Sequence, residues 1–257
     1  MTDIESLLSV TREGPVMVLT MNRPRVRNAM NAALAQEIHT ALTTLDADPE
    51  LRVGVITGAG GVFCSGMDLK AFRAGERPNV EGYGFAGFTA KPPAKPLVAA
   101  VEGYALAGGF EIVLACDLVV ASTEAVFGLP EVKRGLTANA GGLMRLPARV
   151  PYHLAMELTL TGRHFSAEEA KATYLVNRLA EPGRALDAAM ELAREVAANA
   201  PMSLKASKKV INESPSWPID QRFERQEEIV DPVRKSADAQ EGSRAFLEKR
   251  VPVWADR

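Results

Sequence analysis

The 257-residue chain is poor in cysteine, histidine and tryptophan. Cys64 and Cys116 are its only cysteines, so a disulfide framework is not expected and a reducing compartment is favoured. The three histidines, His39, His153 and His164, do not share the spacing of metal ligands. We therefore expect no metal site and assign the histidines no catalytic role.

Long apolar runs and strong charge are also missing. No run approaches the roughly 20 residues that span a bilayer, and residues 1–5 contain no apolar signal core. The net charge of −2 comes without a basic stripe, which argues against a nucleic-acid-binding protein. With 47% hydrophobic and 24% charged residues, the composition is that of an ordinary globular protein. These features predict a cytoplasmic protein with no nucleic-acid or membrane partner.

Short apolar runs alternate with helical patterns over the first half of the chain. Leu34, Ile38, Leu42 and Leu45 give one core face to a helix that Asn31 can cap. This alternation predicts parallel crossover units and hence an α/β fold. After Gly141 the pattern changes to helices. The predicted strands are residues 16–21, 53–58, 97–101 and 118–121.

The segment 74–96 is rich in glycine and proline and contains three aromatic residues, Tyr83, Phe85 and Phe88. Long loops of this kind often form lids or walls of binding sites, although they can also be disordered. We expect this segment to form one wall of a substrate site.

Two glycine-rich loops each follow a predicted buried strand. Gly66 precedes Met67 in the first loop, and Gly108 opens a helix in the second. The backbone amides of Met67 and Gly108 could converge as an oxyanion hole, in which each donor is typically worth about 2.7–4 kcal/mol in a transition state. Glycine turns before helices are also common as purely structural features.

Two glutamates lie close to these loops. Glu111 falls in the first turn of the predicted helix, where it could hold a water molecule or simply complement the helix dipole. Glu131 follows Pro130 on an apolar turn, where burial would raise its pKa and suit it to act as an acid. A surface glutamate that caps the next turn is the alternative for Glu131.

Taken together, these features resemble the crotonase, or enoyl-CoA hydratase, superfamily over nearly the whole chain. The stretch EGSRAFLEKR at 241–250 is also similar to the family. The motifs that carry the resemblance are NRPRVRNAMN at 22–31, FCSGMDL at 63–69, GYALAGGFE at 103–111, FGLPE at 127–131 and GGLMRLP at 141–147.

The resemblance implies a ββα spiral core with an appended C-terminal helical segment. We place the α/β core at residues 1–200 and a helical oligomerisation segment at residues 201–257. Members of the family usually form trimers that pair into hexamers. They act on acyl-CoA thioesters in lipid and fatty acid metabolism, and coenzyme A enters as part of the substrate rather than as a separate cofactor.

The resemblance also implies roles for the site residues. The thioester oxygen would bind the amides of Met67 and Gly108, Glu111 would deprotonate a water molecule, and Glu131 would protonate C2. Family hydratases carry glutamates at both positions, which favours reversible syn hydration of a 2-enoyl-CoA. Carnitinyl-CoA dehydratases share both glutamates and resemble the stretch 108–136. An enoyl-CoA isomerase with a single essential glutamate and a non-catalytic acyl-CoA-binding protein are the remaining alternatives.

Further residues are implied in binding the substrate or its coenzyme A portion. Phe246 and Lys249 would reach the coenzyme from a neighbouring subunit. Asp68 can equally cap a helix, and the cations can equally form solvated surface, as we also expect for Lys205, Lys208 and Lys209. The remaining candidates are Arg25, Arg27, Ala29, Ser65, Asp68, Leu69 and Lys70.

Overall fold

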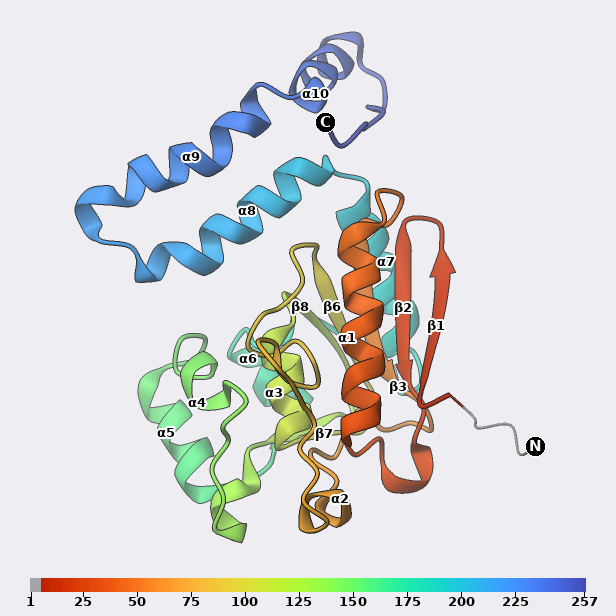
Figure 1. Ribbon diagram of the computed structural model, residues 1–257, viewed down its shortest axis with the longest axis vertical. Coiled ribbons are helices and arrows are strands. Elements are labelled where there is room, and N and C mark those ends of the chain that lie inside the picture. The colour runs from red at the N-terminus through yellow and green to blue at the C-terminus, as the bar shows by residue number, and fades with distance from the viewer. Residues whose placement is uncertain (1–5) are drawn as a thin grey trace.

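The computed structural model describes residues 6–257, so the expectation for residues 1–5 concerns residues outside the described part. A six-stranded sheet in the order β1-β2-β3-β6-β8-β11 runs through the centre of the fold (Figure 1). Its strands are parallel except for β1, which pairs antiparallel with β2. The strands are β1 (Leu8–Glu13), β2 (Val16–Met21), β3 (Val53–Gly58), β6 (Leu97–Val101), β8 (Leu118–Ser122) and β11 (Arg178–Ala180).

The two faces of this sheet bury different residues, because successive side chains of a strand point to opposite sides. Val18, Val55 and Val98 lie next to one another in register on three adjacent strands. They share one apolar cluster with helix α7 (Ala185–Ala197). Ile56, the neighbour of Val55 in the chain, belongs to a larger cluster on the opposite face. The sheet is therefore covered on both faces, as a parallel sheet requires.

Helix α1 (Ala32–Ala47) connects β2 to β3 and contributes its apolar side to the larger cluster. Its predicted cap is confirmed, because the side chain of Asn31 accepts the N–H of Leu34 at 3.0 Å. The strands predicted from apolar runs are confirmed as β2, β3, β6 and β8. The α/β class of the fold is thereby confirmed.

A smaller three-stranded sheet, in the order β10-β9-β7, carries the loops of interest. Strand β7 (Tyr104–Leu106) runs parallel to β9 (Val126–Gly128), and β10 (Phe165–Ser166) runs antiparallel to β9. The segment 74–96 contains a further two-stranded sheet. Its strands are β4 (Asn79–Val80) and β5 (Gly84–Phe85).

The last three helices lie at one end of the molecule in Figure 1, beyond the end of the central sheet. Helix α8 begins at Pro201, whose fixed φ suits the first helical position. None of the helices in residues 6–257 combines the length and apolar character needed to cross a bilayer. The other helices are α2 (Leu69–Arg73), α3 (Gly108–Ala115), α4 (Gly142–Arg145), α5 (Tyr152–Thr161), α6 (Ala167–Ala172), α8 (Pro201–Glu213), α9 (Arg222–Arg234) and α10 (Ala237–Glu248), with short 3₁₀ turns η1 (Pro24–Val26), η2 (Pro130–Arg134), η3 (Ser214–Ser216) and η4 (Ile219–Gln221).

Seven strands of the described chain were not predicted, namely β1, β4, β5, β7, β9, β10 and β11. Strand β1 lies at the edge of the sheet, and five of its six residues are exposed. Its sequence therefore lacks the apolar run from which β2, β3, β6 and β8 were predicted. The prediction that only helices follow Gly141 is wrong, since β10 and β11 lie beyond it. Both are short, two and three residues long, and pair with β9 and β8. Such short strands form because they pair with a strand far away in the sequence, so the local sequence pattern does not predict them.

Lys208 also departs from the prediction of a solvated lysine face on α8. Its Nζ lies 2.6 Å from Oδ2 of Asp117 and donates to the carbonyl of Lys95, and its side chain is only 10% exposed. The same carboxylate oxygen accepts the N–H of Leu97 at 2.8 Å. Lys208 therefore ties α8 to the start of β6.

Candidate active site

Three parallel segments bring the predicted site together. Cys64 forms a parallel bridge to Ala105 in β7, and Ala105 is in register with Phe127 in β9. Because the segments run in the same direction, the residues that follow them emerge at the same edge. Met67 and Gly108 each follow this row by three residues, and Glu131 follows it by four. The site is thus assembled by register between residues far apart in the sequence.

The two predicted amide donors lie where their loops touch. A Cβ added to Gly66 would lie 2.9 Å from the Cβ of Ala107 and 3.4 Å from the amide nitrogen of Gly108, so only glycine allows this approach. The amide of Gly108 is the first of α3 and has no partner within that helix. Asp68 donates its N–H to Met30 O and Gly66 accepts from Met30 N, so the N–H of Met67 points away from Met30.

Glu111 is fixed by two backbone amides. Its Oε1 accepts the N–H of Ala140 at 2.7 Å and that of Gly142 at 2.8 Å, and the residue is only 3% exposed. Burial raises the pKa of Glu111, while these two hydrogen bonds and the positive charge of Arg145 oppose the rise. Oε1 is therefore held in place. A fixed Oε1 would allow the other oxygen, Oε2, to orient a water molecule.

Glu131 lies in the 3₁₀ turn that begins at Pro130, as predicted from the sequence. Its Oε2 is buried and has no hydrogen-bond partner in the described part of the chain. Burial, helped by the negative charge of Glu111, raises the pKa of Glu131 to about 7. A carboxyl group of this kind can carry a proton near neutral pH, so the predicted rise in pKa is confirmed.

A cavity of about 290 Å³ contains both carboxylates. The predicted residues Ser65, Met67, Leu69 and Gly108 line it together with Glu111 and Glu131. Phe85, from the segment predicted to be a wall, lines it as well. The pocket therefore combines two carboxylates with Met67 and Gly108, whose amides are the predicted donors.

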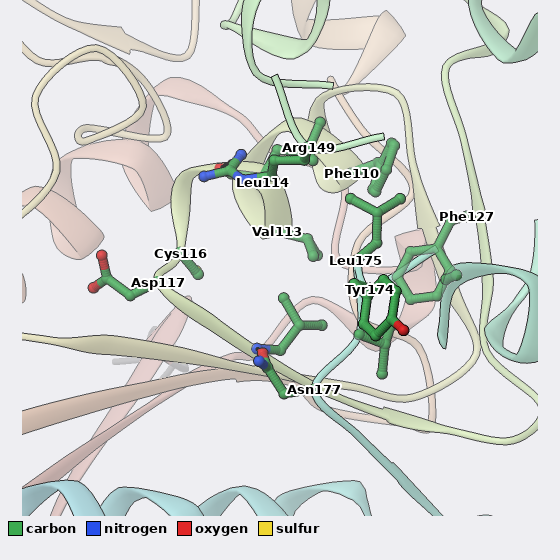
Figure 2. Close-up of a pocket in the computed structure, with 13 residues that line it drawn as sticks. Phe110, Val113, Leu114, Cys116, Asp117, Phe127, Arg149, Tyr174, Leu175 and Asn177 are labelled. Atoms are coloured by element: carbon green, nitrogen blue, oxygen red, sulfur yellow. Dashed lines mark hydrogen bonds between the residues drawn. The ribbon is translucent and has the colours of Figure 1, made fainter. Parts of the chain in front are cut away.

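A second, smaller cavity of about 90 Å³ lies against helix α3 (Figure 2). Phe110, Val113, Cys116 and Arg149 are among the residues that line it, and neither glutamate does. Burial raises the pKa of the Cys116 thiol, which keeps it protonated and unreactive. We therefore locate the candidate site in the cavity of about 290 Å³ that both glutamates line.

Several predicted binding residues lie outside the pocket lining. Asp68 caps α2: its Oδ1 accepts the amides of Lys70 and Ala71, and its Oδ2 pairs with Arg23 at 3.0 Å. The predicted alternative of a helix cap is therefore confirmed for Asp68. The other residues outside the lining are Arg25, Arg27, Ala29, Lys70, Phe246 and Lys249.

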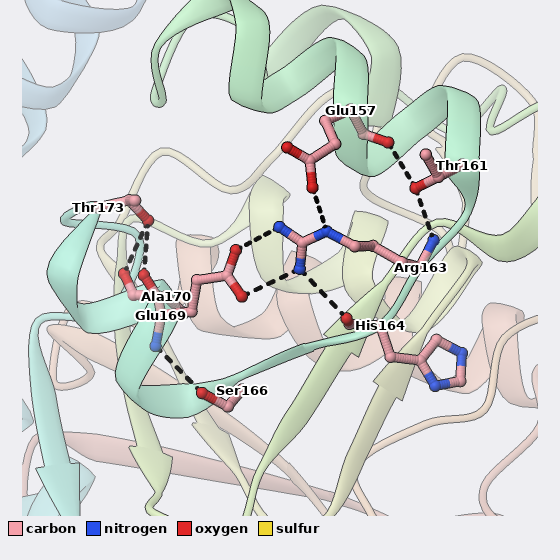
Figure 3. Close-up of polar contacts among 8 residues, drawn as sticks. All are labelled: Glu157, Thr161, Arg163, His164, Ser166, Glu169, Ala170 and Thr173. Carbon is pink, nitrogen blue, oxygen red and sulfur yellow. Dashed lines mark hydrogen bonds and ion pairs between the residues drawn. The ribbon is translucent and has the colours of Figure 1, made fainter.

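No sequence pattern indicated that His164 would line the candidate pocket. It follows Arg163, whose guanidinium joins Glu157 of α5 at 2.6 Å and Glu169 of α6 at 2.6 Å (Figure 3). Burial and the nearby charges of Lys133 and Arg134 lower the pKa of His164. The two ion pairs of Arg163 hold the segment that leads into β10 in place. They thereby hold His164 in the pocket wall.

Other polar lining residues were missed because they lie in or next to short elements that no sequence pattern marks. Arg77 and Asn79 come from the glycine-rich segment 74–96, and Arg134 and Asn139 follow Glu131. The N–H groups of Ala140 and Gly142 bind Glu111. The only sign of them in the sequence is the glycine pair Gly141-Gly142, which was noted there only as part of a family motif.

Similarity to known proteins extends over nearly the whole chain. The model of the family described as Enoyl-CoA hydratase/isomerase matches residues 11–257. A carnitinyl-CoA dehydratase from Salmonella enteritidis is 40% identical over 258 residues, which cover 97% of this chain and 98% of that protein.

Solved structures give the same range of relatives. An enoyl-CoA hydratase from Mycobacterium marinum has 54% sequence identity and a TM-score of 0.97, covering 98% of this chain and 100% of that chain. A carnitinyl-CoA hydratase from Mycobacterium avium has 42% identity and a TM-score of 0.78, again covering 98% and 100% of the two chains.

Proposed function

Because the chain belongs to the enoyl-CoA hydratase/isomerase family, the crotonase superfamily that its sequence resembles, we propose that it is an enoyl-CoA hydratase. It is an enzyme of the hydro-lyase class. The proposed reaction is the reversible syn addition of water to a 2-enoyl-CoA. One observation carries the proposal: two glutamates with different surroundings line the same cavity as Met67 and Gly108.

In this mechanism the amides of Met67 and Gly108 bind the thioester oxygen and stabilise the enolate that forms when water adds to C3. The second oxygen of Glu111 holds the water and removes a proton as its oxygen bonds to C3. Glu131 delivers its proton to C2. Atoms balance, because the substrate gains one water and the proton lost by Glu131 is replaced by the one taken up at Glu111.

The surroundings of the two carboxylates support these roles. Two N–H donors to Glu111 favour its charged form, as a base requires. The buried and unpartnered oxygen of Glu131 favours its protonated form, as an acid requires. The same environments serve the reverse reaction after the proton has moved from one carboxyl to the other.

Coenzyme A is proposed to bind as part of the substrate, without a separate cofactor. Ser65 and Leu69 line the pocket next to Met67. Arg25, Arg27, Ala29 and Lys70 are proposed to contact the nucleotide or the pantetheine outside the pocket. Phe246 and Lys249, on or after α10, are proposed to act on the site of a neighbouring copy in a trimer or hexamer. We place the enzyme in the cytoplasm, in the metabolism of fatty acyl thioesters.

Carnitinyl-CoA dehydratase is the second candidate, favoured by the 40% identity to such an enzyme. Its acyl group would carry a trimethylammonium cation, yet two cations, Arg77 and Arg134, line the pocket. Their hydrogen bonds go to backbone carbonyls rather than to carboxylates. Arg77 also covers the ring of Phe72 at 4.3 Å, a face that could otherwise receive a quaternary ammonium. We therefore propose an uncharged acyl group.

The test is the loss of ultraviolet absorbance by crotonyl-CoA as its conjugated double bond is hydrated. Glu111→Gln and Glu131→Gln should each lower kcat by about 100-fold or more, since general acid–base groups contribute on that scale. Glu124→Gln removes an exposed carboxylate and serves as the matched control. Full activity in both catalytic variants would contradict the mechanism.

The same assay separates the alternatives. A preference for dehydration of carnitinyl-CoA over reaction with crotonyl-CoA would favour the second candidate. Conversion of a 3-enoyl-CoA without gain of water, with one glutamate dispensable, would indicate an isomerase. Tight binding without turnover over a broad panel of thioesters would indicate a non-catalytic binder.

A further inference from the structure

The two amides that hold Glu111 belong to one tight turn, residues 140–142. Residues 135–141, between η2 and α4, form no helix or strand, and α4 begins at Gly142. Gly141 has a φ of +104°, which glycine adopts without strain. The position of Glu111 Oε1 therefore depends on what holds this turn in place.

The side chain of Arg145 packs against the turn. A Cβ added to Gly141 would lie 2.1 Å from Nη1 of Arg145, so the guanidinium packs against the bare backbone of that glycine. Nη1 also makes a long contact of 3.5 Å to the carbonyl of Ala140. Nη2 donates to the carbonyl of Thr89 at 2.5 Å. Arg145 thus joins the turn to the buried residue Thr89, on the segment that forms another wall of the pocket.

We propose that Arg145 is a positioning residue of the catalytic base: it holds the 140–142 turn so that both amides stay on Oε1 of Glu111 and the other oxygen stays available for water. This inference rests on the proposed function for the role of Glu111. Arg145 does not line the catalytic cavity and acts through the backbone.

The charge of Arg145 gives the proposal a second consequence. Among the described residues, the charged groups that face Glu111 are Arg145 from α4 and Glu131 from η2. Arg145 favours the ionised form of Glu111, and Glu131, when ionised, opposes it. Loss of the guanidinium should therefore make Glu111 harder to ionise, which an element that only stabilises the fold would not do.

The experiment compares Arg145→Gln, Arg145→Lys and Arg149→Gln in the intact protein. Arg149 is the matched control, because it is a nearby arginine that donates to the carbonyl of Leu114 in α3 and lines the smaller cavity (Figure 2). With crotonyl-CoA, Arg145→Gln should lower kcat by about tenfold to 100-fold with KM changed less than about twofold, since a small misplacement of a catalytic group costs rate rather than binding. Arg145→Lys should recover part of the loss, and Arg149→Gln should keep kcat.

The acid limb of the kcat/KM profile should move to higher pH in Arg145→Gln and stay in place in Arg149→Gln. The titration of Glu111 can also be followed without turnover, by infrared spectroscopy of protein with ¹³C-labelled glutamate and with Glu111→Gln to identify the band. A wild-type protein inactive on all thioesters would contradict the proposed function, and the infrared titration would still test the role of Arg145. An unchanged kcat together with an unchanged Glu111 titration in folded Arg145→Gln would overturn the proposal.

Discussion

Glu111 and Glu131 line one cavity, but their carboxylates are held in opposite ways. Oε1 of Glu111 accepts two backbone amides at 2.7 and 2.8 Å, whereas Oε2 of Glu131 is buried without a partner among the described residues. Hydrogen-bond donors stabilise a charged carboxylate, and burial without donors destabilises it. The pair is therefore suited to hold a single proton, on Glu131 before hydration and on Glu111 after it.

The pH dependence of the reaction should follow from this shared proton. Glu131 has its pKa raised to about 7, so hydration should fall as the pH rises above that value and the pair loses its proton. On the acid side, activity should fall when Glu111 is protonated as well, at a pH above that of an exposed glutamate because burial raises its pKa. Measurement of kcat/KM against pH should give a bell in both directions of the reaction. A profile that stays flat through neutral pH would contradict the assignment of Glu131.

Glu131→Gln should make the protein more stable at alkaline pH. The folded pKa of about 7 lies above the ordinary value of 4.5, so ionisation favours the unfolded state and stability falls as the pH rises from 4.5 to 7. Since Glu131 is partly exposed, we expect a gain of about 1–3 kcal/mol at pH ~8 rather than the full value of the shift. The gain should shrink towards pH ~4, below both pKa values. Thermal unfolding at the two pH values checks this, and an equal effect at both would be inconsistent with it.

Asp68 should matter for α2 and for its tie to Arg23. Asp68→Ala removes both the cap and the ion pair and should cost about 1–2 kcal/mol of unfolding free energy. Asp68→Asn keeps a capping oxygen and should cost less. Because α2 directly follows the oxyanion-hole residue proposed here, Met67, we expect KM to rise in Asp68→Ala. Chemical denaturation and steady-state kinetics measure the two effects, and equal stability of both variants would refute the capping role.

Lys208 should anchor α8 to the central sheet more strongly than its neighbour Lys209. Lys208 pairs with Asp117 and is 10% exposed, whereas Lys209 pairs with Glu213 on the surface and is 52% exposed. Lys208→Gln should cost about 1–3 kcal/mol, because it leaves a partly buried carboxylate without its ion-pair partner. Lys209→Gln should stay within about 0.5 kcal/mol, as exposed pairs contribute little. Denaturant unfolding of both variants tests the difference.

The C-terminal helices should associate with other copies of the chain. Large apolar side chains are strongly exposed there, among them Ile219, Phe223, Phe246 and Leu247. An exposed apolar surface of this kind marks an interface. We predict a trimer or hexamer by light scattering, and a monomer at micromolar concentration would count against the proposed role of residues 201–257 in oligomerisation.

Local sequence was enough for the elements that carry their own signals. The apolar runs at 53–58 and 97–101 are buried strands, and Asn31 and Ser166 begin helices because their side chains accept amides three residues ahead. Ser166 and Glu169 have the sequence spacing of a capping box, but only the bond from the N–H of Glu169 to the Ser166 hydroxyl forms. Glu169 turns to Arg163 instead of reaching back to the helix start (Figure 3). A charged partner from outside the helix outweighs the local bond.

The amino-acid sequence by itself determined the α/β class, the crotonase relationship and the identity of both glutamates, because strands, caps and motifs are written in neighbouring residues. Only the tertiary structure decided how the glutamates differ. The amides of Ala140 and Gly142 and the guanidinium of Arg145 act on Glu111 across 29 to 34 positions of sequence, and burial leaves one oxygen of Glu131 without a partner among the described residues. Burial and hydrogen bonding set a pKa through the atoms that surround a group, and those atoms come together only when the chain is folded.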